Sequence, residues 1–496
     1  MAVRKRIIMP MLFLLVCTAV ISYSCTTTRQ CWVNHAISPL QFGINDAKTG
    51  EERYFVLLGT HEEAQRLGVG VSYDGIKNIE LAIPTGAKSI PLTNYTDFAG
   101  VTIRVENNQK GLYLFTLSAD LNPVSVSGEE IDSKDYGNNP TLFAGHKLLV
   151  ITDKTPWVEK RKGHDYGAIR RDIMLVKHGR GSNDPVQCYC TNTTVPECYY
   201  CDVSGVPKIV FKNVKFERTA TSTQKTNLVK IENHYGVELS KITINTPDGT
   251  GLYGDRAVYI VNCIDVKLSD ITINGTYSLP GAYGYGISLD NVYDFRVDNL
   301  YARANWGVFG NNNVNRAYLK NCDFNRFDIH CYGRDVSFEN CNFVDLYNQF
   351  SSVYGNVSFK NCTFNRFRPI LIESSYNAYT AFDVTFEGCV FNFDKEHFSV
   401  VDFSGFGKEI NTRPELRDKC LPNVTMRDCR INLTDGQKKW YVYNTKKIKD
   451  YIGRFSHISK VLIEGVSING DASSFDIFSK KIETEKEVEL KASFKK

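Results

Sequence analysis

After residue 21 the sequence contains no apolar run long enough to cross a lipid bilayer, which argues against a membrane-spanning helix in the rest of the chain. It also lacks any large excess of one charge. The formal net charge is +4, and it falls to about +1 without the three basic residues near the N-terminus. So weak an overall field argues against nucleic acid as a partner. Any anion must therefore be bound by a local group of basic side chains.

The first 24 residues predict a secretory signal peptide. Arg4, Lys5 and Arg6 precede an apolar run from Ile7 to Ile21, which at about 15 residues is too short to span a bilayer comfortably. We therefore expect an exported protein. Cys25 is the expected lipidated first residue of an outer-membrane lipoprotein at the cell surface or in the periplasm, and a secreted form is the alternative. The lipid would be the only membrane contact, and we expect a monomer.

Cysteine is concentrated in two sets. Cys188, Cys190, Cys198 and Cys201 lie in the segment CYCTNTTVPECYYC, a spacing that fits two disulfides or a four-thiolate zinc site. Export favours the disulfides. The second set occupies one position of an internal repeat, and we expect those cysteines to be packing residues because other copies carry Val, Ile or Leu there.

That repeat occurs ten times between Lys208 and Gly470, with copies such as NVSFKNCTF and DVTFEGCVF. Aligned copies place apolar residues in one column, and a second apolar column lies two residues later. The first column contains Ile209, Val237, Val266, Phe295, Ala317, Val336, Val357, Val384, Val424 and Val461. A period of two is typical of a strand with one buried face. Repeats of this length predict a solenoid, because one coil cannot bury its apolar face without neighbours.

The shortest copy excludes a helix in every repeat. It runs from residue 316 to residue 334, which leaves room for three short strands with tight bends but not for a strand, a helix and their connections. We therefore predict an all-β fold, a parallel β-helix of about ten or more coils with strands stacked at the usual sheet spacing. A right-handed coil is expected because parallel crossovers are nearly always right-handed.

The expected organisation has four parts. Residues 1–24 are the signal peptide, and residues 25–205 form an N-terminal cap with the first coils, including a helical segment at 61–67, the strand-like pieces GVTIRVEN and HKLLVITDK, and an excursion at 184–205. Residues 206–470 form the regular β-helix. Residues 471–496 form a C-terminal cap or tail.

A further strand in each coil aligns on pieces such as AVYIV, GISLD and DIHCY. Alternation along that strand turns one set of side chains outward: Tyr259, Ser288, Phe309, His330, Ser352, Leu371 and Val401. Polar, cationic and aromatic residues at both ends of the strand follow the same face. Such a face suits a long carbohydrate, with rings for stacking, arginines for acidic groups and amides for hydroxyls. Single Asn and Asp residues at coil corners also fit turns or ladders.

These repeats resemble the right-handed β-helix proteins of the pectate-lyase-like superfamily, and the segment NWGVFGNNNVNRAYLKNCDFNRFDIHCYG is similar to β-helix proteins of phage tails and gut bacteria. The resemblance implies a protein that binds a polysaccharide or cleaves it as a hydrolase or a lyase. Lyases that act on chondroitin and hyaluronan are among the enzymes it suggests. It transfers no individual site residue, because a fold does not dictate a function.

The chain departs from two site patterns of that superfamily. NTPDG at 245–249 partly matches the Asn-Thr-Asp segment of the hydrolases, but their Asp pair and Gly-His-Gly are missing. The calcium-dependent pectate lyases need clustered acidic groups, whereas this face offers Asp328 and Glu373, fewer oxygens than a calcium ion requires. We therefore predict no metal and no other cofactor, with calcium as a less favoured alternative.

The favoured function is an exported lyase that cleaves a uronic-acid polysaccharide, such as a glycosaminoglycan, by β-elimination. His330 is the predicted base, with Tyr332 or Tyr285 as the acid. Arg326 and Asn305 are predicted to neutralise the uronate carboxylate, with Arg368 as a further candidate.

Predicted substrate-binding residues complete the site: Arg368, Trp306, Asp328, Arg334, Tyr354, Glu373 and Arg256. Asp328 is also a candidate to orient the predicted base. Two other functions stay open. One is a glycoside hydrolase that uses Asp255, Asp328, Glu373 or Asp402. The other is a glycan-binding or adhesion protein without catalysis.

Overall fold

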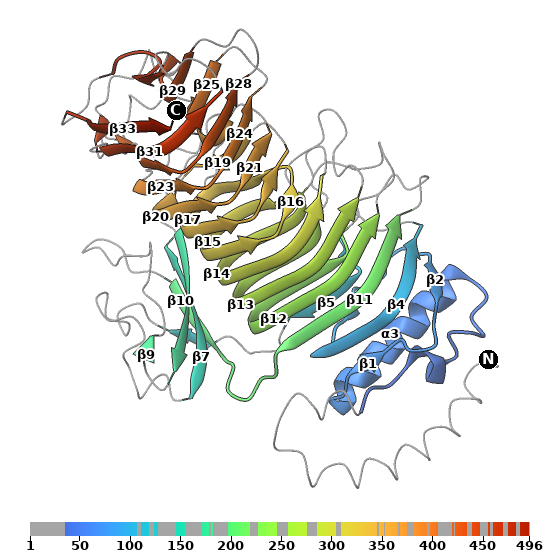
Figure 1. Ribbon diagram of the computed structural model, residues 1–496. Coiled ribbons are helices and arrows are strands. Elements are labelled where there is room, and N and C mark those ends of the chain that lie inside the picture. The colour runs from blue at the N-terminus through green and yellow to red at the C-terminus, as the bar shows by residue number, and fades with distance from the viewer. Residues whose placement is uncertain are drawn as a thin grey trace.

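The computed structural model describes most of the chain from residue 35 onward (Figure 1). The described residues are 35–106, 111–118, 124–126, 145–153, 170–177, 180–181, 197–218, 227–245, 256–274, 285–303, 309–344, 347–351, 353–365, 368–373, 381–393, 397–404, 419–420, 422–433, 439–446, 455–456, 460–469, 475–482 and 487–495. The predicted signal peptide and Cys25 lie outside them. Within this part of the chain, no helix has the length and apolar character needed to cross a membrane.

Within the described residues up to 202, the chain forms two helices and two groups of strands. Its first elements are η1 (Pro39–Phe42), α3 (Gly50–Leu67), β1 (Val71–Ser72), β2 (Asn78–Leu81), β3 (Ile90–Pro91), β4 (Tyr95–Val105) and β5 (Phe115–Ser118). They are followed by β6 (Val124–Val126), β7 (His146–Asp153), β8 (Arg170–Lys177), β9 (Arg180–Gly181) and β10 (Glu197–Asp202).

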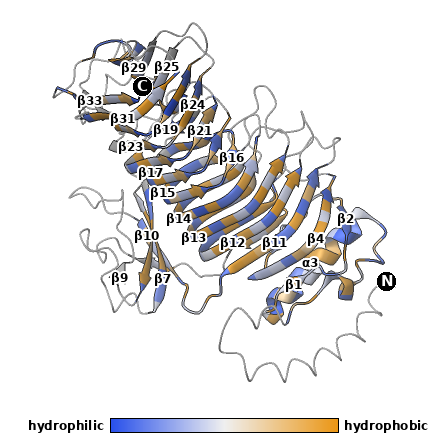
Figure 2. Ribbon diagram, viewed as in Figure 1, coloured by the Kyte–Doolittle hydropathy of each residue, from blue (hydrophilic) through white to orange (hydrophobic). Residues whose placement is uncertain are grey.

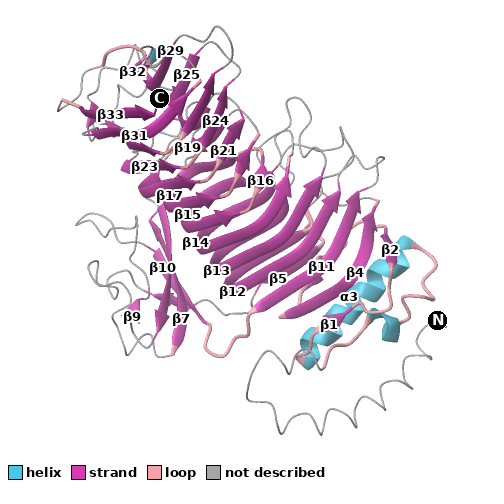
Figure 3. Ribbon diagram, viewed as in Figure 1, coloured by secondary structure: helices cyan, strands magenta, loops and turns pink. Residues whose placement is uncertain are grey.

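Strands dominate the rest of the chain (Figure 3). The next elements are β11 (Ile209–Arg218), β12 (Val229–Asn245), β13 (Arg256–Asn274), β14 (Tyr285–Ala302), β15 (Phe309–Lys320), β16 (Asp323–Phe324), β17 (Phe327–Glu339), β18 (Asn342–Phe343), β19 (Tyr347–Phe350), β20 (Val353–Lys360), β21 (Thr363–Asn365) and β22 (Arg368–Glu373). The last are β23 (Ala381–Glu387), β24 (Val390–Phe393), β25 (His397–Ser404), β26 (Lys419–Cys420), β27 (Asn423–Arg427), β28 (Arg430–Leu433), β29 (Lys439–Asn444), β30 (Phe455–Ser456), β31 (Lys460–Ile468), β32 (Phe475–Phe478) and β33 (Glu489–Lys495).

The predicted parallel β-helix is confirmed. Successive parallel pairings run through β4, β11, β12, β13, β14, β15, β17, β20, β23, β27, β31 and β33. Each pair of neighbours in the first predicted column is a direct partner, from Ile209 with Val237 to Val424 with Val461. Figure 1 shows these strands stacked as the coils of one elongated solenoid.

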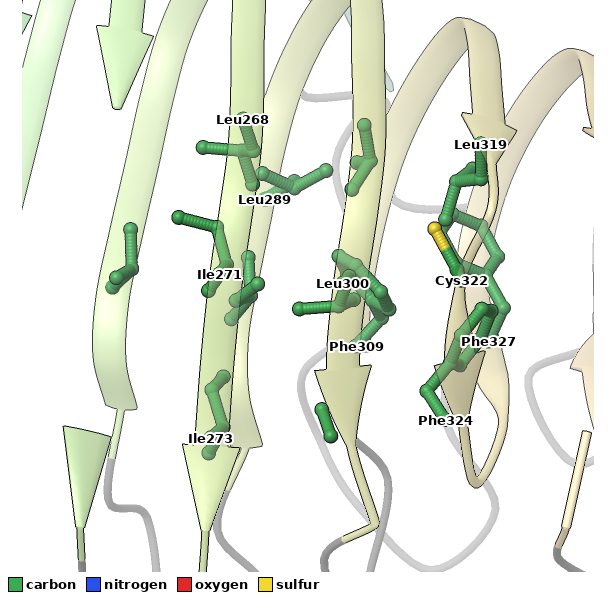
Figure 4. Close-up of a cluster of buried hydrophobic side chains, with 14 of the residues drawn as sticks. Leu268, Ile271, Ile273, Leu289, Leu300, Phe309, Leu319, Cys322, Phe324 and Phe327 are labelled. Carbon is green, nitrogen blue, oxygen red and sulfur yellow. The ribbon is translucent and has the colours of Figure 1, made fainter. Parts of the chain in front are cut away.

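The apolar columns form the interior of this solenoid. Figure 2 shows apolar and polar residues alternating along its strands, and Figure 4 shows side chains such as Leu268, Ile271 and Leu300 turned inside. Phe338 and Phe359 stack with ring centroids 4.9 Å apart and planes at 6°. Phe359 also stacks on Phe386 at 5.0 Å, so its ring has a like partner on both sides, as the stacking of like residues predicted from the repeat requires.

The cysteine column of the repeat also lies inside. It consists of Cys322, Cys341, Cys362, Cys389 and Cys429, and all five side chains are buried. Each thiol donates to a backbone carbonyl, as Cys362 does to Lys360 at 3.4 Å. The five act as small apolar packing residues with a satisfied S–H group, as their alignment with Val, Ile and Leu predicted.

Asparagines shape the bends between strands. Asn262, Asn291 and Asn313 have φ values of 49°, 59° and 50°, in the left-handed region that Asn tolerates better than most residues. Asn291 Nδ2 donates to Asn262 Oδ1 at 2.8 Å, and Asn313 Nδ2 donates to Asn291 Oδ1 at 2.6 Å. These side chains therefore form a ladder from coil to coil, which leaves them a structural role.

The helix α3 covers the N-terminal end of the solenoid (Figure 1). A capping box starts it, since the Glu52 amide donates to Thr49 Oγ1 at 3.1 Å and the Thr49 amide donates to Glu52 Oε2 at 3.1 Å. Gly68, with a φ of 66°, ends it. The predicted helical segment 61–67 is therefore the last part of a longer helix, whose buried face protects the open strand edges.

A buried histidine in this cap makes stability depend on pH. His61 Nε2 lies 2.8 Å from the Tyr73 hydroxyl, and burial lowers the pKa of His61 to about 3, against roughly 6.5 in an unfolded chain. Between pH 3 and pH 6.5 the histidine is protonated in the unfolded chain but neutral in the folded protein. The contribution of neutral, buried His61 to the free energy of unfolding is therefore complete above pH 6.5 and decreases as the pH falls. We expect about 2 kcal/mol to be lost between pH 6.5 and pH 5.

Thermal unfolding of the wild type and His61→Gln at pH 7 and pH 5 measures this effect. The variant should show the smaller decrease in unfolding temperature on acidification. Burial also lowers the pKa of His234, to about 4, but that residue is common to both proteins and cancels in the comparison. Equal decreases in the two proteins would contradict the assignment to His61.

The described strands between residues 124 and 202 differ from the expected first coils. The piece HKLLVITDK contributes β7, which pairs antiparallel with β8 and β10 and not with any solenoid strand. The resulting sheet, β6–β10–β7–β8–β9, lies against the outside of the solenoid, where Leu148 and Ile173 pack with Ile264 and Tyr293. The periodicity correctly predicts strands here, but periodicity does not reveal which partner a strand pairs with.

The strand β10 of that sheet carries two of the four cysteines predicted to form disulfides. Cys198 and Cys201 are buried in β10, whereas Cys188 and Cys190 lie outside the described residues. The pairing of the four therefore stays a prediction.

The C-terminal residues extend the last coil. β32 pairs parallel with β29, and β33 pairs parallel with β31. Most of β33 is exposed. The predicted terminal cap or tail thus adds strands to the end of the solenoid.

Candidate active site

The outer face of one solenoid sheet carries a column of aligned side chains. Tyr259, Ser288, Gly310 and Asp328 are consecutive partners on β13, β14, β15 and β17. At the entrance to these strands, Arg256 is the partner of Tyr285. An entrance position and an outward-pointing column therefore run side by side along the solenoid, although Ser288 and Asp328 in that column are buried.

The register corrects the sequence alignment at two positions. Phe309 pairs with Ile287 and Phe327, and its side chain is fully buried. Val401 pairs with Ile370 and is also in the core. Both had been expected to point outward. At Phe309 the one-residue shift arose because the sequence before β15 has no repeat spacing that fixes the register.

His330 owes its position to a β-bulge. Asn311 pairs with Ile329, but the next residue, Asn312, pairs with Cys331. His330 is therefore the extra residue of β17, inserted between two paired positions. A bulge re-aims the side chain it carries and bends the strand locally. The sequence predicted that His330 points outward, but it contains no signal for the bulge.

His330 is brought together with Tyr285, as two of the predicted catalytic residues. The Tyr285 hydroxyl lies 3.1 Å from His330 Nε2, and the ring centroids are 5.7 Å apart at an interplanar angle of 60°. Both residues are half-buried. At this distance the Tyr285 hydroxyl can donate to His330 Nε2 when the imidazole is unprotonated. The contact therefore joins a candidate base, His330, to a candidate acid, Tyr285, and a proton can pass between them.

Arg326 and Asp328 lie next to this pair in the chain but are buried. Arg326 Nη2 lies 2.8 Å from Asp328 Oδ2, and the two side chains are 3% and 0% exposed. The Asn325 side chain also accepts from the Arg326 amide at 2.9 Å. This placement argues against the predicted direct contact of both residues with a substrate. The sequence could not show the reason, which is that the two opposite charges neutralise each other below the surface.

Arg368 is also matched by a carboxylate. Its Nε lies 2.7 Å from Asp402 Oδ2, and the Asp402 side chain is only 2% exposed. Asp402 Oδ1 also accepts from the Phe403 amide at 2.8 Å. Two of the arginines predicted to neutralise a substrate carboxylate are thus already paired with acidic side chains.

Arg256 is placed differently. Its guanidinium lies over the Tyr259 ring, 4.5 Å from the centroid, and Tyr259 in turn stacks on Tyr113 at 6.1 Å. Among the described residues Arg256 forms no ion pair with a carboxylate, although its charge also acts on the nearby carboxyl of Asp290, whose ion pair is with Arg171. A half-buried arginine on an aromatic surface keeps its charge available for an anion. Neither Tyr113 nor its contact with Tyr259 was identified from the sequence, because they come from distant segments.

An acidic residue borders the same surface. Asp290 Oδ2 lies 3.3 Å from both the Tyr259 hydroxyl and Arg171 Nη1, and burial raises the pKa of Asp290. Burial is also the main cause that raises the pKa of Tyr259 to about 12. Arg171 belongs to β8, so this group also connects the antiparallel sheet to the solenoid.

The other predicted site residues are only partly described. Asn305 and Trp306 lie outside the described residues, as do the side chains of Tyr332, Tyr354 and Glu373. Arg334 lies further along β17, where its Nε is 3.3 Å from Asp335 Oδ2. Over the described part of the chain, no group of three or more His, Cys, Asp or Glu side chains could hold a metal ion.

The fold and this face define a parallel β-helix protein with a tyrosine–histidine pair on its outer surface. No protein-family model matches the chain, and no curated protein matches it.

Among solved structures, the chain is similar to the tailspike protein gp49 from Pseudomonas phage LKA1, with 14% identity over 89% of this chain and 77% of that chain and a TM-score of 0.52. The gp54 tailspike of Acinetobacter baumannii bacteriophage AP22, solved in complex with A. baumannii capsular saccharide, has 11% identity over 90% of this chain and 79% of that chain and a TM-score of 0.47. The match to gp49 supports the resemblance to phage-tail β-helix proteins at the level of the fold.

Proposed function

We propose that the protein is an exported polysaccharide lyase that cleaves a uronic-acid polymer on the outer face of its β-helix. The observation that carries this proposal is the 3.1 Å contact between the Tyr285 hydroxyl and His330 Nε2. A histidine with a nearly neutral ordinary pKa can remove a weakly acidic proton, and a phenol can supply one. Such a base and acid in contact, each half-buried, match the two proton transfers of β-elimination.

In the proposed reaction, His330 removes the C5 proton of a uronate. The electron pair of that C–H bond forms the C4–C5 double bond, and the C4–O bond breaks. The leaving oxygen takes the proton that Tyr285 donates, so no oxidant, reductant or cofactor is consumed. Asn305 is the remaining predicted donor to the uronate carboxylate, since Arg326 and Arg368 pair with Asp328 and Asp402.

Arg256 supports a substrate with repeated acidic groups. It lies on β13, and the strands β14, β15 and β17 follow in order to His330. Three strand spacings amount to roughly 14 Å, more than one sugar unit. Arg256 would therefore bind the carboxylate of a neighbouring sugar while Tyr113 and Tyr259 provide the aromatic surface.

Incubation with chondroitin, hyaluronan and pectin tests the proposed activity. A lyase produces an unsaturated uronate whose formation is followed by absorbance at 232 nm. Absorbance should rise on at least one of these polymers. The proposal would fail if none of the three gave an unsaturated product.

Two other functions predict different results. A hydrolase would release reducing sugar without ultraviolet absorbance, but two of its candidate carboxylates, Asp328 and Asp402, are buried in ion pairs. A glycan-binding protein would bind the polymer and consume none of it. The Arg256–Tyr259–Tyr113 surface favours this second alternative over the hydrolase, because it can bind an acidic sugar without any catalytic group.

A further inference from the structure

We infer that Gly310 is a positioning residue, whose missing side chain lets the Tyr285 ring cross one coil of the solenoid to reach His330. The inference rests on the proposed function only for its effect on catalysis. Its structural content, the path of the tyrosine ring, can be tested without any substrate.

The first argument is steric. A Cβ atom built on Gly310 would lie 2.5 Å from both Cγ and Cδ2 of Tyr285 and 2.6 Å from Cε2. Real Cβ atoms essentially never approach other heavy atoms so closely. The obstacle would be the body of an aromatic ring and not a flexible chain end. Tyr285 could therefore keep its present position only with a glycine at residue 310.

The second argument concerns the spacing of the coils. Tyr285 starts β14 and His330 lies in β17, with β15 between them. Two strand spacings amount to roughly 10 Å, so the two side chains must meet above the intervening strand. In that strand the outer column holds Gly310, whereas it holds Ser288 on β14 and Asp328 on β17. The position without a side chain therefore lies on β15, the one strand that the Tyr285 ring has to cross.

The third argument excludes the usual reason for a glycine. Glycines such as Gly355, with a φ of 74°, lie in the left-handed region where other residues are strained. Gly310 is not among the residues with positive φ, and it lies inside a regular strand. Its backbone would accept any residue that suits a strand. The requirement is therefore for empty space above the strand, and Tyr285 fills it.

The substitution Gly310→Ala tests this inference, and Gly59→Ala in helix α3 is the control for a methyl group added where a Cβ meets nothing within 4 Å. Imidazole signals are followed by NMR as a function of pH in the wild type, Tyr285→Phe, Gly310→Ala and the double variant, and His330→Gln identifies the signal. The His330 midpoint should move by at least about half a pH unit in Tyr285→Phe. Gly310→Ala should shift it in the same direction, and the double variant should add nothing further.

An unchanged His330 midpoint in Gly310→Ala, or additive shifts in the double variant, would overturn the inference. If Gly310→Ala alone is too unstable to study, Tyr285→Ala combined with Gly310→Ala supplies the decision. With the ring removed, the double variant should unfold at the same temperature as Tyr285→Ala alone. An unfolding temperature that stays lower in the double variant would also overturn the inference. In a protein with lyase activity, Gly310→Ala should lower kcat about ten- to a hundredfold with little change in KM. These NMR and unfolding results do not depend on whether lyase activity is found.

Discussion

The variant His330→Gln is expected to lose a hundredfold or more of the activity on a uronate polymer, because general-base catalysis typically contributes about 10²–10⁴ in rate. Glutamine keeps a polar side chain close to the hydroxyl of Tyr285, which lies 3.1 Å from His330 Nε2 in the wild type, but it cannot accept the substrate proton at neutral pH. Initial rates at 232 nm on the best substrate measure the loss.

Measurements of polymer affinity show whether a variant has lost the catalytic base or the substrate-binding surface. Polymer affinity should stay within a few-fold of the wild type in His330→Gln, since Arg256 and the Tyr113–Tyr259 stack remain intact. Arg256→Gln is the complementary variant and should weaken affinity for an acidic polymer while the chemical step is less affected. A His330→Gln protein with the wild-type rate would rule out His330 as the base.

Asp328→Asn is expected to destabilise the protein by about 3–5 kcal/mol, because it leaves the guanidinium of Arg326 buried without a counter-charge. The two side chains are 3% and 0% exposed and lie 2.8 Å apart, so water cannot replace the lost carboxylate. Chemical unfolding of the variant and the wild type measures the difference.

A matched control lies in the same strand. Arg334 and Asp335 are 3.3 Å apart, but both side chains are 39% exposed, so Asp335→Asn should cost at most about 1 kcal/mol. Equal small effects in the two variants would show that the buried pair carries little stability. If Asp328→Asn were fully stable but inactive, the substrate-binding role predicted from sequence would regain support.

Much of the fold could be predicted because the solenoid repeats one local pattern. The column from Ile209 to Val461 was readable since each coil must present an apolar residue at the same place for its neighbours to cover. The antiparallel strand β7 carries similar strand-like periodicity, yet its partners are β8 and β10. Periodicity reports a buried face, whereas strand pairing depends on contacts between distant segments.

The candidate site was predictable only in part. His330 and Tyr285 were both candidates from the sequence, because strand alternation and position in the coil place such residues on the surface. Arg326 and Asp328 looked equally suitable, and only their ion pair and burial showed otherwise. Charge and residue type do not reveal whether a side chain faces solvent or is covered by other parts of the chain.

The sequence by itself determined the solenoid, its inward columns and the face on which polar and aromatic residues gather, because these follow from a period that every coil repeats. Only the tertiary structure decided which of those residues meet. The bulge at His330, the empty position at Gly310 and the Tyr285 ring above it belong to three different strands. Their contact depends on register and on the absence of one side chain, and neither is encoded by the local pattern of a single strand.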